Sequence, residues 1–93
     1  MMFLVVYDVG DSSIRARIAK LLEGYGRRVQ ESVFECALTR QAHAELAGRL
    51  KSELKDPENG NVRIYRICAD CLAASVGMGR LPDDPGREGF MIY

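Results

Sequence analysis

A carboxylate that ends an apolar run is the first feature of the sequence that could do chemistry. Residues 2–7 are apolar or aromatic, and Asp8 follows them directly. Burying a charge is costly, so a carboxylate here needs a partner or a place at the rim of a sheet. One interpretation is a helix cap or an ion pair with Arg15 or Arg17. The other is a ligand for a hard metal ion, Mg²⁺ or Mn²⁺, which prefers oxygen ligands.

A single aspartate gives too few metal ligands, but two copies of Asp8 that face each other across a two-fold axis would be enough. The same strand favours such a pairing. In an extended chain Phe3 and Val5 point to one face, and Leu4 and Val6 point to the other. Because both faces are apolar, the second needs a cover, and the simplest cover is another copy of the chain. We therefore expect a homodimer.

Three cysteines and one histidine offer a second kind of chemistry. Cys68 and Cys71 have the spacing of a zinc half-site or of a redox pair. A second pair of ligands is lacking, so buried packing thiols are the favoured interpretation. Cys36 is expected in the core, and His43 is expected at the surface without a role as a general base.

The charge balance excludes little. Thirteen basic and thirteen acidic side chains cancel, so the net charge indicates neither nucleic acid nor membrane. Most basic residues are arginines, which suit bidentate contact with phosphate, although arginine-rich codon usage would give the same composition. An apolar start without a basic leader, too short to span a bilayer, predicts a cytoplasmic protein with no membrane contact. The candidates for contact with a nucleic-acid backbone are Arg15, Arg17, Arg27, Arg28, Arg63 and Arg66.

These residues must be positioned by a regular alternation of strands and helices. Residues 2–9 read as a strand, and a helix capped by Asp11, Ser12 or Ser13 follows. Two short strands within residues 26–38 turn at Glu31–Ser32, and a second helix begins after Thr39. Residues 56–61 read as a loop, 62–67 as a strand, 68–76 as a turn or helical hook, 77–89 as loop and 89–93 as a last strand.

The order strand, helix, strand pair, helix, strand predicts one α+β domain over residues 1–93. It is the ferredoxin-like βαββαβ arrangement with an extra C-terminal strand, packed through its sheets as a homodimer. The second helix carries an apolar stripe formed by Ala42, Leu46, Leu50 and Leu54. Two helices on one face leave the other face of the sheet open, which agrees with the need for a second copy.

Three segments resemble the small CRISPR-associated endonuclease family, the second of the two near-universal proteins of spacer adaptation. They are Tyr7–Asp8 at the end of the first strand, the basic helix that ends at Tyr25–Gly26, and Arg28–Glu35, which reads RVQESVFE. The stretch VRIYRICADC fits as well. The resemblance covers roughly residues 2–75.

The resemblance implies a metal-dependent endonuclease that acts on double-stranded DNA or single-stranded RNA and binds Mg²⁺ or Mn²⁺ at a dimer interface. It implies Asp8 as the metal ligand and catalytic residue, Tyr7 beside it, and Ser32 and Phe34 near the active cleft. It also implies a partner, the CRISPR adaptation integrase, with which the homodimer holds a prespacer duplex. Some family members show no nuclease activity, so a non-catalytic DNA-binding scaffold is the alternative, and a toxin-type ribonuclease is a third interpretation.

Overall fold

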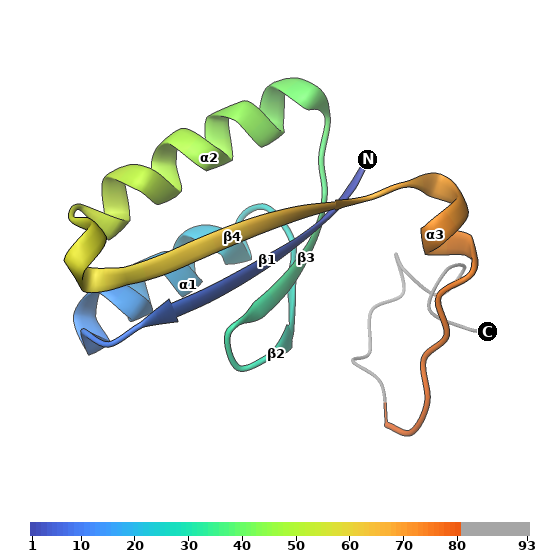
Figure 1. Cartoon of the computed structure of the whole chain (residues 1–93), viewed down its shortest axis with the longest axis horizontal. Helices are drawn as coiled ribbons and strands as arrows, with labels where there is room; N and C mark the ends of the chain where they lie inside the picture. Colours follow the sequence, from blue (N-terminus) through green and yellow to red (C-terminus); the bar gives the residue numbers. More distant parts are fainter. Residues whose placement is uncertain (81–93) are drawn as a thin grey trace.

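The computed structural model describes residues 1–80, and the expected strand at 89–93 lies outside them. The chain forms a four-stranded sheet with two long helices, as the sequence predicts (Figure 1). A short 3-10 helix precedes the fourth strand, and a short third helix follows it. In chain order the elements are β1 (Met2–Val9), α1 (Ser12–Glu23), β2 (Arg27–Gln30), β3 (Val33–Ala37), α2 (Arg40–Leu54), η1 (Pro57–Asn59), β4 (Gly60–Ile67) and α3 (Ala69–Ala73).

The sheet has the strand order β2-β3-β1-β4, and every neighbouring pair is antiparallel. β1 is therefore a central strand, which explains its continuous apolar sequence. It pairs with β4 along its whole length, from Met2 opposite Ile67 to Val9 opposite Gly60. The predicted ferredoxin-like α+β fold is confirmed.

The hydrophobic core lies between the sheet and the two long helices. Successive residues of β1 alternate, so that one set points to the helices and is buried while the other set points away. Asp11 caps α1 by accepting hydrogen bonds from the backbone N–H groups of Ser13 and Ile14, both at 2.9 Å. The buried side chains under the helices are Phe3, Val5, Tyr7, Val9, Ile14, Ile18, Leu22, Phe34, Cys36, Leu46 and Leu50.

Within residues 1–80, no helix covers the face of the sheet opposite α1 and α2. Leu4 and Val6 on β1 are only half-buried there, and so is Val33 on β3. Tyr65, opposite Leu4 on β4, keeps 49% of its surface exposed. The charged Glu35 and Arg63 lie among these apolar side chains, which the predicted dimer would cover.

Three local predictions need correction. β4 begins at Gly60, two residues before the expected start, because Gly60 and Asn61 pair with the end of β1 although their residue types favour a loop. His43 is half-buried, since its ring stacks on Phe3 with ring centroids 4.2 Å apart. Cys68 and Cys71 are exposed, not buried, because they follow the end of β4, where the helix-covered core stops.

Candidate metal and nucleic-acid site

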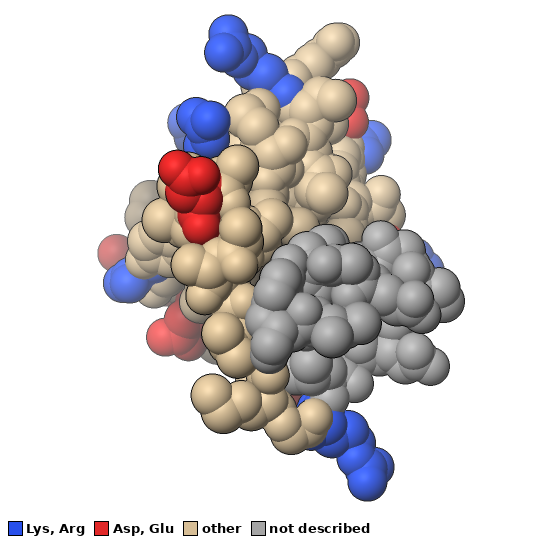
Figure 2. Space-filling model, turned by 90° about the vertical axis from the view of Figure 1, so that its right-hand side faces the viewer, with Lys and Arg blue, Asp and Glu red and all other residues tan. Residues whose placement is uncertain are grey.

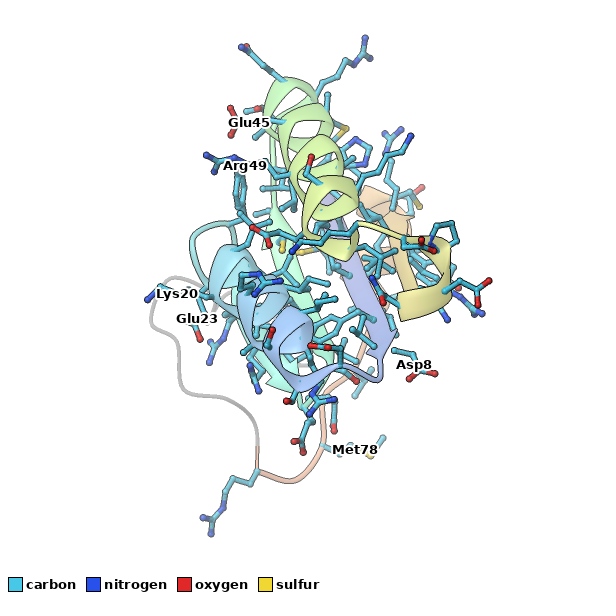
Figure 3. All side chains as sticks on the ribbon, turned by 90° about the vertical axis from the view of Figure 1, so that its left-hand side faces the viewer. Asp8, Lys20, Glu23, Glu45, Arg49 and Met78 are labelled. Atoms are coloured by element: carbon cyan, nitrogen blue, oxygen red, sulfur yellow. The ribbon has the colours of Figure 1, made fainter. Side chains whose placement is uncertain are left out.

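Asp8 lies at the end of β1 on the open face of the sheet, and its side chain is exposed. Figure 3 shows it at the edge of the molecule, pointing away from α1 and α2. Within residues 1–80 it makes no hydrogen bond or ion pair. The rim position explains how a charge can follow an apolar strand, because water still solvates it.

The structural partners considered for Asp8 are engaged elsewhere. Asp11, not Asp8, caps α1. Arg15 donates to the backbone carbonyls of Val9 and Gly10, at 2.9 Å and 3.3 Å. Arg17 forms an ion pair with Glu53 across the two helices, with Nε and Oε1 3.1 Å apart. The carboxylate of Asp8 is therefore available for a ligand.

Gly60 fixes the backbone at Asp8. The two strands approach so closely that a Cβ on Gly60 would lie 2.1 Å from the carbonyl oxygen of Asp8. Gly60 also has a φ of 138°, which side-chain-bearing residues rarely adopt. Only glycine fits this junction. The position of the Asp8 carboxylate therefore depends on Gly60, which begins β4 and follows α2 in the chain.

Asn61 is a site residue that the sequence analysis missed. It stands directly opposite Asp8 in the register of β1 and β4, and its side chain is exposed. Residues that are directly opposite on antiparallel strands point to the same face, with Cβ atoms about 5 Å apart. The amide of Asn61 therefore comes from the position neighbouring the carboxylate on the same face. The only available signal was the tertiary pairing, because an asparagine after Asn59–Gly60 reads as part of a turn.

The donor set fits a hard metal ion but is incomplete in one chain. No group of three or more histidine, cysteine, aspartate or glutamate side chains within residues 1–80 could hold a metal ion. One protomer offers a carboxylate with a neighbouring amide, and both are oxygen ligands of the type that Mg²⁺ prefers. Two copies would double that set and leave positions for water.

Tyr7, Ser32 and Phe34 lie apart from the Asp8 carboxylate. Tyr7 points to the helix side, is buried, and donates a 3.3 Å hydrogen bond to the carbonyl of Glu31. Its backbone N–H donates to the carbonyl of Ser32 at 3.1 Å. Phe34 has no exposed surface. These contacts hold β1 against β3 and the β2–β3 turn. A catalytic role for the three residues stays a prediction.

Burial raises the pKa of Tyr7, and the positive charges of Arg28 and Arg15 partly oppose this. The phenol therefore stays protonated at neutral pH, as its hydrogen bond to the Glu31 carbonyl requires. In the single chain Tyr7 acts as a buried donor that anchors the end of β1.

Four of the six candidate arginines, Arg15, Arg17, Arg27 and Arg28, occupy three places, and Arg63 stands opposite Val6 on the open sheet face. Arg15 and Arg28 meet beside Tyr7, where a hollow of about 220 Å³ opens between α1 and β2. The guanidinium of Arg28 lies over the Phe34 ring, 5.3 Å from its centroid. Arg17 lies on the helix surface, and Arg27 stands opposite Glu35 in the register of β2 and β3. Only Arg15 and Arg28 are brought together.

A second basic hollow was not predicted as a unit. It has a volume of about 250 Å³ and lies between the start of α2 and the end of β4. Arg40, His43 and Arg66 contribute its polar lining. The sequence named Arg66 alone, because residues 26 positions apart in the chain come together only when α2 folds over the sheet.

Basic side chains do not merge into one broad patch on the visible part of the right-hand face. Figure 2 shows them standing apart from one another, with acidic side chains between some of them. This agrees with the balanced composition. On this face, contact with a nucleic-acid backbone would use separated basic side chains, one phosphate at a time. No helix within the described residues is long and apolar enough to cross a membrane.

The fold and the strand-end aspartate define a class: a small ferredoxin-like α+β protein with an acidic residue at the rim of an open sheet. The chain belongs to the CRISPR-associated protein Cas2 family, whose family model matches residues 1–74. It is 51% identical over 71 residues to a CRISPR-associated endoribonuclease Cas2 of Chloroflexus aurantiacus, covering 76% of each chain. It is 43% identical over 93 residues to the Mycobacterium tuberculosis protein of that name, covering 100% of this chain and 78% of the relative.

Solved structures agree with the family assignment. The crystal structure of Streptococcus pyogenes Cas2 superposes with a TM-score of 0.71 at 32% identity, over 85% of this chain and 100% of that one. A chain in a structure described as a partial Cas6-RT-Cas1–Cas2 complex gives a TM-score of 0.70 at 32% identity, over 80% of this chain and 86% of that one.

Proposed function

We propose that this protein acts in CRISPR adaptation as a homodimer that binds double-stranded prespacer DNA together with the adaptation integrase. We further propose that it hydrolyses phosphodiester bonds with Mg²⁺ or Mn²⁺ held between two copies of Asp8. The observation that carries the catalytic part is the exposed carboxylate of Asp8, which has no partner among residues 1–80, on the sheet face opposite the helices of a Cas2-family chain.

The open sheet face supports the dimer. Leu4, Val6, Val33 and Tyr65 lie on this face together with the charged Glu35 and Arg63, and Asp8 lies at its end. Covering this surface with its own copy removes apolar area from water and brings one carboxylate from each chain to the same rim. Two carboxylates that approach each other repel, and a shared cation relieves the repulsion.

In this mechanism the two Asp8 side chains would hold the metal ion, and each Asn61 would supply a neighbouring amide that can accept or donate a hydrogen bond. A bound Mg²⁺ ion supplies Lewis-acid activation of the scissile phosphate and of the attacking water. Arg15 and Arg28 bind backbone phosphates away from the scissile bond and set the register of the strand. Gly60 keeps the carboxylate at the rim.

The integrase partner and the substrate rest on the comparisons. One structural neighbour belongs to a Cas6-RT-Cas1–Cas2 complex, which supports a complex with an integrase of the Cas1 type. Curated relatives are named endoribonucleases, so single-stranded RNA is the second substrate to test beside duplex DNA.

The test compares Asp8→Ala with wild-type protein on duplex DNA and on single-stranded RNA, with Mg²⁺, with Mn²⁺ and with a chelator. We expect the wild type to cut with metal and the variant to lose at least about tenfold in rate, a cost of roughly 1.4 kcal/mol in the barrier. The matched control is Glu23→Ala, which removes an exposed carboxylate on the helix side (Figure 3). Undiminished cleavage by Asp8→Ala would remove the proposed site.

A non-catalytic scaffold is the second candidate function, and one observation favours it. Arg15, Arg17 and Arg28 lie on the helix side or at β2, away from Asp8, so they can hold DNA without a working metal site. A scaffold would bind duplex DNA with an affinity that falls steeply with salt, and it would cut nothing. In that case Arg28→Ala would weaken binding and Asp8→Ala would not.

A further inference from the structure

The two exposed cysteines form a local pair with defined geometry. Cys68 is the first residue after β4 and caps α3, and Cys71 follows one helical turn later. The backbone N–H of Cys71 donates to Sγ of Cys68 at 3.3 Å. Both thiols are free and exposed, so small molecules can reach them.

This pair is separate from the Asp8 site. Asp8 stands opposite Asn61 near the start of β4, whereas Cys68 follows Ile67 at its other end. In Figure 1 α3 lies beyond the end of the sheet that is opposite the β1–α1 turn. Neither the proposed metal site nor the arginines near Tyr7 use these thiols.

The surroundings make the two thiols unequal. The backbone N–H of Cys71, together with the Cys71 side chain, lowers the pKa of Cys68, and the nearby charge of Arg66 acts in the same direction. The pKa of Cys71 is raised, because its thiol donates to the Cys68 sulfur and the negative charge there disfavours a second one. Asp70 lies between them in sequence, and its backbone N–H also favours the Cys68 thiolate.

Cys36 provides an internal contrast. It is completely buried in the core, and burial raises its pKa to about 11. A thiol of this kind is inert in the folded protein, because reaction requires an accessible thiolate.

We propose that Cys68 and Cys71 form a reversible intramolecular disulfide, in which Cys68 attacks the oxidant and Cys71 resolves the intermediate. The oxidant is a low-molecular-weight disulfide. The Cys68 thiolate attacks one sulfur of that disulfide, its S–S bond breaks, and one thiolate leaves. Cys71 then loses its proton and attacks Sγ of Cys68, and the second thiolate leaves. The protein loses two electrons and two protons, and the small disulfide is reduced to two thiols.

Disulfide formation fits the pair better than metal binding within one chain. Two sulfur ligands leave a zinc ion half-coordinated, and no further histidine, cysteine or carboxylate within residues 1–80 joins them in a ligand group. A disulfide needs only the two thiols one helical turn apart. This inference does not rest on nuclease activity or on dimer formation.

The test treats the reduced full chain with oxidised glutathione, blocks remaining thiols with an alkylating agent and measures the intact and peptide masses. Trypsin separates the exposed pair from Cys36, because one peptide, residues 67–80, carries both Cys68 and Cys71. Another peptide, residues 29–40, carries Cys36. In the wild type we expect peptide 67–80 to lose two hydrogen atoms and Cys36 to carry no glutathione. Dithiothreitol should restore the two free thiols of peptide 67–80.

Single variants test the assigned roles. Cys71→Ser should stop at a mixed disulfide between Cys68 and glutathione. Cys68→Ser should react about three- to tenfold more slowly, because the remaining thiol has a smaller thiolate fraction. Cys36→Ser is the matched control and should behave as the wild type does. A wild type that keeps glutathione attached without closing the ring, or a Cys68→Ser variant that reacts as fast as Cys71→Ser, would overturn the proposal.

Discussion

Replacing Gly60 with alanine tests the claim that this residue sets the β1–β4 junction beside Asp8. The new Cβ would lie 2.1 Å from the Asp8 carbonyl oxygen and 2.9 Å from Cα of Val9. Both atoms belong to the backbone of a central strand, so no side-chain rotation can relieve the contact. The φ of 138° adds strain of about 1–3 kcal/mol for any residue with a Cβ.

Together the strain and the steric overlap should cost about 3 kcal/mol or more, a large part of the roughly 5–15 kcal/mol that stabilises a typical domain. For a domain of this size about 1 kcal/mol lowers Tm by roughly 4–8 °C, so the expected fall is about 12–24 °C. Thermal unfolding followed by circular dichroism measures it, at one protein concentration, because self-association adds apparent stability.

Gly48→Ala is the matched control. Gly48 lies in α2, and a Cβ there would meet no atom within 4 Å. Alanine in an exposed helix interior is about 0.5–1 kcal/mol more favourable than glycine, so this variant should unfold at a slightly higher temperature. A Gly60→Ala protein as stable as wild type would refute the reasoning about the junction and, with it, the argument that the junction fixes the Asp8 carboxylate.

Three further predictions concern the core, the surface and the first helix. Phe34→Ala should cost about 3–5 kcal/mol in urea unfolding, because it empties a fully buried site between the sheet and α1. Glu53→Gln should change the free energy of unfolding by no more than about 1 kcal/mol, because the ion pair with Arg17 is partly exposed. The exposed fractions of the side chains are 35% for Glu53 and 43% for Arg17. A larger loss would show that the pair does more than join two helix surfaces. Hydrogen bonds from the backbone N–H groups of Ile14 and Ser13 lower the pKa of Asp11 from 3.8. The stabilising effect of this carboxylate is therefore present above pH 3.8 and is lost as the pH falls through the lowered pKa. Asp11→Ala should therefore destabilise the protein at neutral pH and differ less from wild type in acid, whereas Asp11→Asn should retain most of the cap at both.

Local patterns accounted for most of the secondary structure. Helical spacing and capping residues predicted α1 and α2, and Asp11 and Thr39 cap them as expected. Alternation along β1 predicted that Phe3 and Val5 lie on one face of the sheet and Leu4 and Val6 on the other. These features depend on neighbours in the chain, and a sequence displays such neighbours directly.

Predictions about residues distant in the chain were less complete. Asn61 and Gly60 read as a loop, yet pairing with β1 draws them into β4. Cys68 and Cys71 looked like packing residues, and the end of the helix-covered core leaves them exposed. Arg15 and Arg28 were named separately, and only the fold brings them together beside Tyr7.

The sequence by itself determined the order of strands and helices, the two-sided apolar character of β1 and the presence of a carboxylate at its end. The tertiary structure decided that this carboxylate has no partner in the described part of the chain, that Asn61 stands opposite it and that only glycine fits at position 60. The physical reason is one of range. Propensity, periodicity and capping act between residues a few positions apart, whereas strand register and packing join residues more than fifty positions apart, and only the folded chain fixes those distances.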